Sequence, residues 1–130
     1  YNDDTLYVLW TETGMTRYCD TELALYIDGT ETASYSVSEI VGTTTAMTGP
    51  STIVDNGNIM FTATTSDASY LITLPDSYVE ISSVQYGAMI EHNGYLYMSH
   101  DNGNIAAYKN EPVWETDFEN GPVYGTPAVN

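Results

Sequence analysis

The chain has 130 residues, enough for one domain with a hydrophobic core, and its hydrophobic content of 42% is ordinary for a globular protein. Eighteen Asp and Glu residues against two Lys and Arg residues give a formal net charge of −16, which would repel nucleic acid or an anionic membrane surface. We therefore exclude nucleic-acid binding, and membrane insertion as well, because no apolar run approaches the roughly 18 residues of a membrane span.

Short runs in which apolar and polar side chains alternate predict an all-β fold with almost no helix. The clearest run is 95–100, where Leu96 and Met98 alternate with tyrosines. Gly, Asn and Asp between the runs favour tight turns. In chain order, the predicted strands lie at 5–10, 23–27, 33–37, 51–54, 59–63, 70–74, 78–84, 85–91, 95–100, 105–109, 113–118 and 124–129.

A repeat organises these strands. Gly49, Gly87 and Gly125 lie 38 residues apart, and each precedes a strand-like run. Four short antiparallel strands followed by a restart are typical of a β-propeller blade. We therefore predict about three blades of four antiparallel strands in one domain, at about 1–47, 48–85 and 86–123, with 124–130 a strand of the next or first blade.

The amino-acid sequence of the last repeat resembles the repeat of a known protein family. Gly-Tyr-Leu-Tyr-Met-Ser-His-Asp-Asn-Gly-Asn-Ile-Ala-Ala-Tyr at 94–108, Pro-Val-Trp-Glu-Thr at 112–116 and Gly-Pro-Val-Tyr-Gly-Thr-Pro-Ala-Val at 121–129 look like the repeat of the PQQ-like (quinoprotein-type) β-propellers. The resemblance is clearest over residues 85–130. It implies that Trp114 docks between blades and that the Thr126-Pro127 pair opens the next blade.

The two ends of the chain complement each other. The first repeat opens on the 5–10 run, which matches the second strand of the other repeats, while 124–129 reads as a first strand with no blade after it. The chain also starts at Tyr1 without Met, so we expect either a processed subunit or a fragment of a longer propeller.

Unpaired strand edges attract partners, so the ring is completed either by another copy of the chain or by missing sequence. The expected subunit contacts lie in the two matching runs: Thr5, Leu6, Tyr7, Val8, Leu9, Trp10, Tyr124, Thr126, Pro127, Ala128 and Val129.

The sequence contains no phosphate loop, no Gly-x-Ser-x-Gly elbow and no Cys/His pair at a plausible spacing. His92 and His100 could form a two-histidine metal site, but we interpret them as exposed residues near turns. The Asp-Asn-Gly-Asn segments at 55–58 and 101–104 are interpreted as turns, with weak calcium binding as the alternative. We therefore assign no catalytic, cofactor-binding or metal-binding residue and no cofactor.

Two functions from different classes fit these observations. The first is a non-enzymatic structural subunit, extracellular or at the cell surface, that self-assembles into a filament, sheath or surface layer. The alternative is a carbohydrate-binding propeller module that oligomerises to complete its ring, with glycans as partners and Trp10 or Trp114 as stacking platforms. The family resemblance implies bound quinone only for dehydrogenases with a full ring, a catalytic Asp and calcium, none of which can be assigned in this chain.

Overall fold

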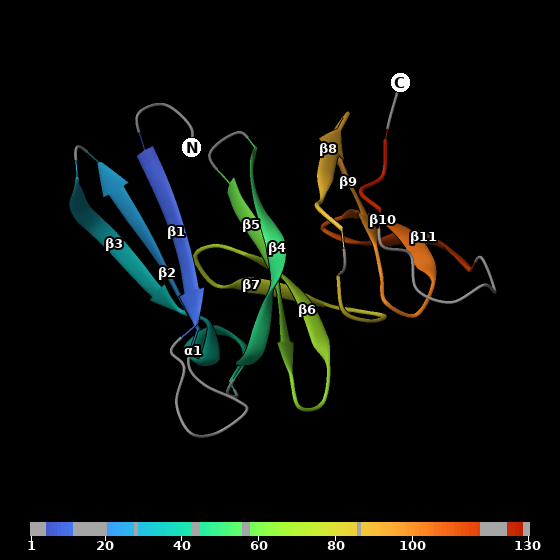
Figure 1. The fold of residues 1–130 in the computed structure, drawn as a ribbon, viewed down its shortest axis with the longest axis horizontal. Coiled ribbons are helices and arrows are strands. Elements are labelled where there is room, and N and C mark those ends of the chain that lie inside the picture. Colours follow the sequence, from blue (N-terminus) through green and yellow to red (C-terminus); the bar gives the residue numbers. More distant parts are fainter. Residues whose placement is uncertain are drawn as a thin grey trace.

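The computed structural model describes residues 5–11, 21–27, 29–42, 45–55, 58–85, 87–117 and 125–128. Within these residues it contains eleven β-strands and one short helix. The strands form three antiparallel sheets, one of three strands and two of four (Figure 1). The prediction of an all-β protein is therefore confirmed.

The first sheet has three strands in the order β1-β2-β3: β1 (Thr5–Thr11), β2 (Thr21–Ile27) and β3 (Thr30–Ser36). The helix α1 (Val37–Val41) follows directly and ends at Gly42, whose φ of +78° is the left-handed conformation usual after a helix. In the first sheet, β1 is an edge strand.

The second sheet follows chain order, β4-β5-β6-β7. Its strands are β4 (Thr45–Asp55), β5 (Asn58–Thr65), β6 (Ser69–Thr73) and β7 (Ser77–Ile81). Each hairpin connects neighbouring strands, and such local pairing explains why the alternating sequence runs are sufficient to locate them.

The third sheet repeats that pattern. Its strands are β8 (Ile90–His92), β9 (Tyr95–Ser99), β10 (Asn104–Lys109) and β11 (Glu111–Asp117), also in chain order. A two-residue turn with φ of 54° at Asn93 and 77° at Gly94 joins β8 to β9. Both turn residues have positive φ, as the favoured hairpin turns require.

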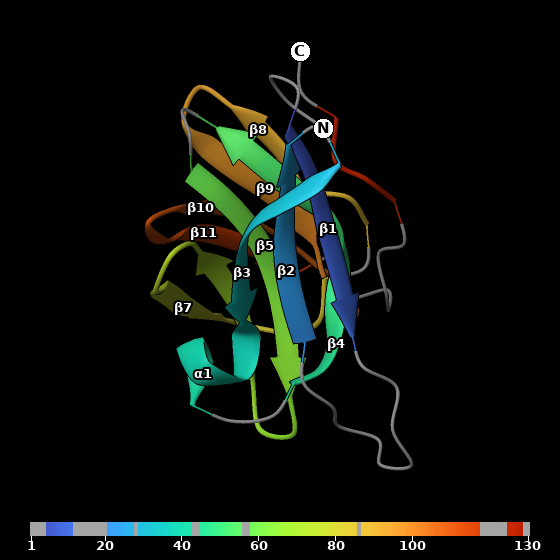
Figure 2. The same ribbon diagram turned by 90° about the vertical axis from the view of Figure 1, so that its left-hand side faces the viewer.

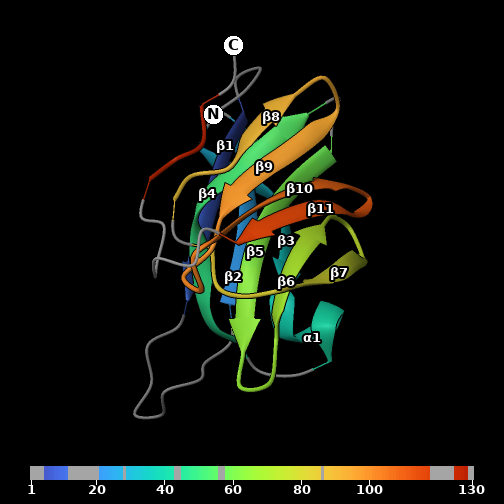
Figure 3. The same ribbon diagram turned by 90° about the vertical axis from the view of Figure 1, so that its right-hand side faces the viewer.

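The three sheets stack side by side, with the second between the first and the third (Figure 1). Figure 2 views the stack from the first sheet, and Figure 3 from the third sheet. Because side chains alternate along a strand, β5 supplies both interfaces: Phe61 packs with Val37 of α1, while Met60 packs against the cluster containing Leu96 of β9. The core therefore consists of two layers, one on each side of the second sheet.

The structure departs from the sequence-based boundaries in several places. Val37, predicted as the end of a strand, begins α1. Among the described residues of the run predicted at 85–91, only Ile90 and Glu91 belong to a strand, β8, and Gln85 forms an isolated bridge with His100. Of the strand predicted at 124–129, the described part, 125–128, is not a strand.

Candidate functional site

One side of the third sheet is covered by none of the other sheets that the structure describes (Figure 1). Met98 of β9 and Ala106 of β10 face the second sheet, so their neighbours Tyr97 and Ala107 face the opposite way. Ala107 pairs with both Tyr97 and Trp114, which brings these three residues together on one side of the sheet. We call the surface formed by Tyr95, Tyr97, Ala107 and Trp114 the aromatic face.

The rings of the aromatic face hold one another in place. The ring centroids of Tyr97 and Trp114 are 6.2 Å apart, and those of Tyr95 and Tyr97 are 6.4 Å apart, both within the range of favourable aromatic pairs. Ala107 between them is fully buried, whereas Trp114 remains 45% exposed. Lys109 places its Nζ 5.1 Å from the centre of the Tyr95 ring, a cation–π contact. The result is an ordered apolar surface that contacts solvent.

A short segment of the chain is bound beside this face. The Ser99 hydroxyl donates a 2.7 Å hydrogen bond to the Gly125 carbonyl and accepts one of 3.2 Å from the Gly87 N–H. The Ala88 N–H donates to the Thr126 hydroxyl at 3.1 Å. A Cβ on Gly87 would overlap the Gly125 carbonyl oxygen and approach its carbon to 2.7 Å. Glycine at 87 is therefore required for this close contact.

The same arrangement occurs one repeat earlier. Thr62 follows Phe61 in β5 as Ser99 follows Met98 in β9, and its hydroxyl donates a 2.6 Å bond to the Gln85 side chain. Gln85 in turn donates a 2.6 Å bond to the Gly87 carbonyl. In both repeats, a hydroxyl of the second strand thus binds a segment that lies 23 to 26 residues later in the sequence. Gly125 lies 38 residues after Gly87, which precedes the third sheet.

The interface between the second and third sheets buries two titratable side chains. His100 is fully buried; its Nδ1 lies 3.0 Å from the Ser83 carbonyl and its Nε2 3.3 Å from the Tyr108 hydroxyl. Burial lowers the pKa of His100, and burial together with the charge of Glu115 raises the pKa of Tyr108 to about 12. The prediction that His100 is exposed is wrong, because its ring is buried between Ser83, in the segment after β7, and Tyr108 of β10.

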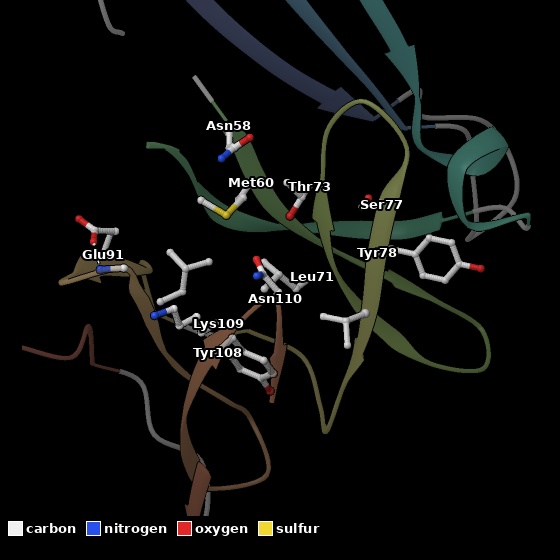
Figure 4. Close-up of a pocket in the computed structure, with 13 residues that line it drawn as sticks. Asn58, Met60, Leu71, Thr73, Ser77, Tyr78, Glu91, Tyr108, Lys109 and Asn110 are labelled. Carbon is white, nitrogen blue, oxygen red and sulfur yellow. Dashed lines mark hydrogen bonds between the residues drawn. The ribbon is translucent and has the colours of Figure 1, made fainter. Parts of the chain in front are cut away.

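A cleft of about 470 Å³ opens at one end of the same interface (Figure 4). Its floor is apolar and includes Met60, Leu71 and Leu96, while Tyr78, although near its edge, points away from the other labelled side chains in Figure 4. The polar residues that line it come from both sheets: Asn58, Thr73, Ser77, Glu91, Lys109 and Asn110.

The predicted contact residues fall in two regions. Thr5, Leu6, Tyr7, Val8, Leu9 and Trp10 form most of β1, whose backbone alone is described. In the other run, Thr126 binds Ala88, Pro127 is partly buried and Ala128 is exposed, while Tyr124 and Val129 lie outside the described residues. Contact between the two runs stays a prediction.

Sequence reasoning did not identify Tyr97 or Gly87 as parts of a site. The 38-residue spacing of Gly87 and Gly125 was the available signal for their contact. Trp114 was expected between blades; in this chain it lies on the aromatic face.

Comparison of the sequence with models of protein families and with curated proteins finds no match. The resemblance to the PQQ-like propeller repeat therefore stays a prediction from the residues themselves. Within the described part of the chain, no helix is long and apolar enough to cross a membrane. The same residues contain no group of three or more His, Cys, Asp or Glu side chains that could hold a metal ion.

Proposed function

We propose that this protein is a non-enzymatic structural subunit, extracellular or at the cell surface, that assembles with copies of itself. Its sheets would be blades of the β-propeller type, related to the PQQ-like repeat. Assembly would extend the stack of sheets beyond the one chain, as a filament, sheath or surface layer.

The observation that carries this proposal is the aromatic face, on which none of the described sheets packs. On the second sheet, the equivalent side is covered by the third sheet: Leu71 belongs to the buried cluster between them, and the partly buried Met60 packs against it. On the third sheet, Tyr97 occupies the position of Met60, yet Trp114 beside it is 45% exposed. Burying one large apolar side chain is worth about 2 kcal/mol, so covering this face with another sheet would be favourable.

The edge of the first sheet supports the same proposal. β5 and β9 each pair with a preceding strand, β4 or β8, whereas β1, among the described residues, pairs only with β2. A first strand from a neighbouring copy would fit there, joined by backbone hydrogen bonds as in strand addition. The 124–129 run is the expected donor, and Pro127, which lacks an N–H, suits a strand at an edge.

The test is the oligomeric state of the purified protein. Sedimentation velocity and electron microscopy over a range of concentrations should show species larger than the 14.3 kDa monomer. Because a net charge of −16 makes copies repel, salt, calcium or mild acid should favour assembly. Monomers under all these conditions, or association that is strongest in low salt at pH 8, would contradict the proposal.

Saccharide binding is a second candidate, and the cleft between the second and third sheets favours it. Its amide, hydroxyl and charged side chains above an apolar floor suit a polyhydroxylated ligand. Micromolar binding on a glycan array, weakened by Thr73→Val in the cleft but unchanged by Thr32→Val on the first sheet, would support this function. Long ordered fibres from the protein alone, without glycan binding, would support the structural one.

A further inference from the structure

We infer that copies of this chain join head to tail, with the outer face of the first sheet of one copy docked on the aromatic face of the next. This inference rests on the proposed self-assembly and specifies its surfaces. The outer face is defined by the register positions of Leu6 and Val8 on β1 and of Ala24 and Tyr26 on β2.

The contact between the second and third sheets of this chain serves as the template. The third sheet contributes Leu96 and Met98 from β9 and Ala106 and Tyr108 from β10, all of them nearly or fully buried. In the sheet, Met98 lies opposite Ala106 and Leu96 opposite Tyr108. These four positions form the surface by which a sheet packs on the sheet before it.

The first sheet repeats this surface in sequence and in register. Val8 lies opposite Ala24 and Leu6 opposite Tyr26, as Met98 lies opposite Ala106 and Leu96 opposite Tyr108. The Ala-x-Tyr pattern of 106–108 recurs at 24–26. The first sheet therefore carries the apolar pattern of a sheet that packs on a preceding one.

Ala24, which is fully buried, and Tyr26 lie on the side of the first sheet that none of the described sheets covers (Figure 1). Tyr35 of β3 packs into the core between the first and second sheets, so its neighbour Ser34 faces away from the second sheet, and it is exposed. Ala24 lies opposite Ser34 and therefore shares that outer side. Tyr26 is only partly buried there, whereas its counterpart Tyr108 is 2% exposed.

The charges on the two faces favour the head-to-tail orientation. Lys109, the one Lys or Arg among the described residues, lies over Tyr95 on the aromatic face. Glu31 accepts a 3.0 Å hydrogen bond from the Tyr26 hydroxyl on the outer face. Two outer faces together would oppose two Glu31 side chains, whereas on the aromatic face Glu111 lies opposite Lys109 in the register and offsets part of its charge. Joining unlike faces instead pairs opposite charges.

A head-to-tail contact leaves one free face at each end of every assembly. The assembly therefore adds copies until it closes as a ring, or it continues to grow as a filament. This property allows a test with two variants, each blocked at one face only. Trp114→Glu places a charge on the aromatic face, and Ser34→Glu places one on the outer face; both positions are exposed, so neither change disturbs the core.

Each variant alone should be monomeric at concentrations where the unmodified protein assembles, with association weakened at least about tenfold, as for charge placed in an interface core. An equal mixture should form a dimer of two chains and nothing larger, because one intact face of each kind remains. Ser66→Glu, an exposed turn position on the second sheet, is the matched control and should assemble normally. Circular dichroism verifies that all three variants fold.

The outcomes separate the inference from the proposed function. If the unmodified protein never assembles, both fail. If it assembles and both variants also do so alone, the proposed function stands but these faces are not the contact. If Ser34→Glu dimerises alone and Trp114→Glu does not, two aromatic faces meet each other and the head-to-tail arrangement is wrong.

Discussion

The Ser99 hydroxyl donates a 2.7 Å hydrogen bond to the carbonyl of Gly125, which joins β9 to a residue 26 positions later. Ser99 is fully buried and also accepts a bond from the Gly87 N–H. It thus satisfies two backbone groups that have left water, and leaving such groups unpaired is costly.

We predict that Ser99→Ala lowers the free energy of unfolding by about 1–3 kcal/mol, the usual cost of orphaned buried polar groups. Urea unfolding followed by circular dichroism measures the change. Ser66→Ala is the control, since its hydroxyl bonds Asp67 on the surface and its loss should change little. Equal effects of the two substitutions would show that the bond to Gly125 contributes nothing.

Gly87→Ala should release the 125–128 segment. A Cβ at position 87 would overlap backbone atoms of Gly125, which cannot rotate away as a flexible side chain can. Limited proteolysis should then cut the chain after residue 120 at a rate at least several-fold higher. Ala88→Gly is the control, because it changes a neighbouring residue but keeps the backbone hydrogen bond to Thr126.

Acid should weaken the fold through His100. Burial lowers its pKa in the folded state below the ordinary value of 6.5, so between these two pKa values only the unfolded chain binds the proton. Stability is therefore fully present above pH 6.5 and falls as the pH drops through that window. His100→Gln should remove this part of the pH dependence, whereas His92→Gln, a change on the partly exposed histidine of β8, should keep it. Unfolding curves from pH 7.5 to 5 provide the measurement.

A chain that ends at Gly121 should keep much of its fold yet stay monomeric, because it lacks the strand expected to pair with β1 of a neighbour. A peptide of residues 122–130 should compete with assembly of the intact chain. Light scattering measures both effects. If the shortened chain assembles as well as the intact one, strand exchange is wrong.

Most strands could be predicted from alternation because each pairs with a sequence neighbour, so local pattern and local pairing agree. Alternation predicts only residues 51–54 of β4, because Gly49 and Pro50 are residues that usually interrupt a strand. The register of β4 with β5 shifts between Thr48 and Thr52, and such a bulge on an edge strand accommodates both residues within one long strand. The single turn of α1 has too few residues to show a helical period.

The site was harder to predict because it depends on contacts between sheets. Nothing near His100 in the sequence indicates that Ser83 of the preceding repeat accepts its hydrogen bond. The aromatic face likewise follows from which side of β9 meets the second sheet, and alternation alone leaves that side undetermined. The 38-residue spacing did place Gly87 and Gly125 at equivalent positions, but not in contact.

The position of the second sheet, packed on both sides, has a consequence for the motions of the protein. Opening either outer sheet breaks one interface, whereas opening the second breaks both, so amide hydrogens of β5 and β6 should be the last to exchange. The outer sheets carry the proposed docking faces and have the least support. Each added copy would turn an outer sheet into an inner one, so assembly would make the fold of every subunit more rigid as it proceeds.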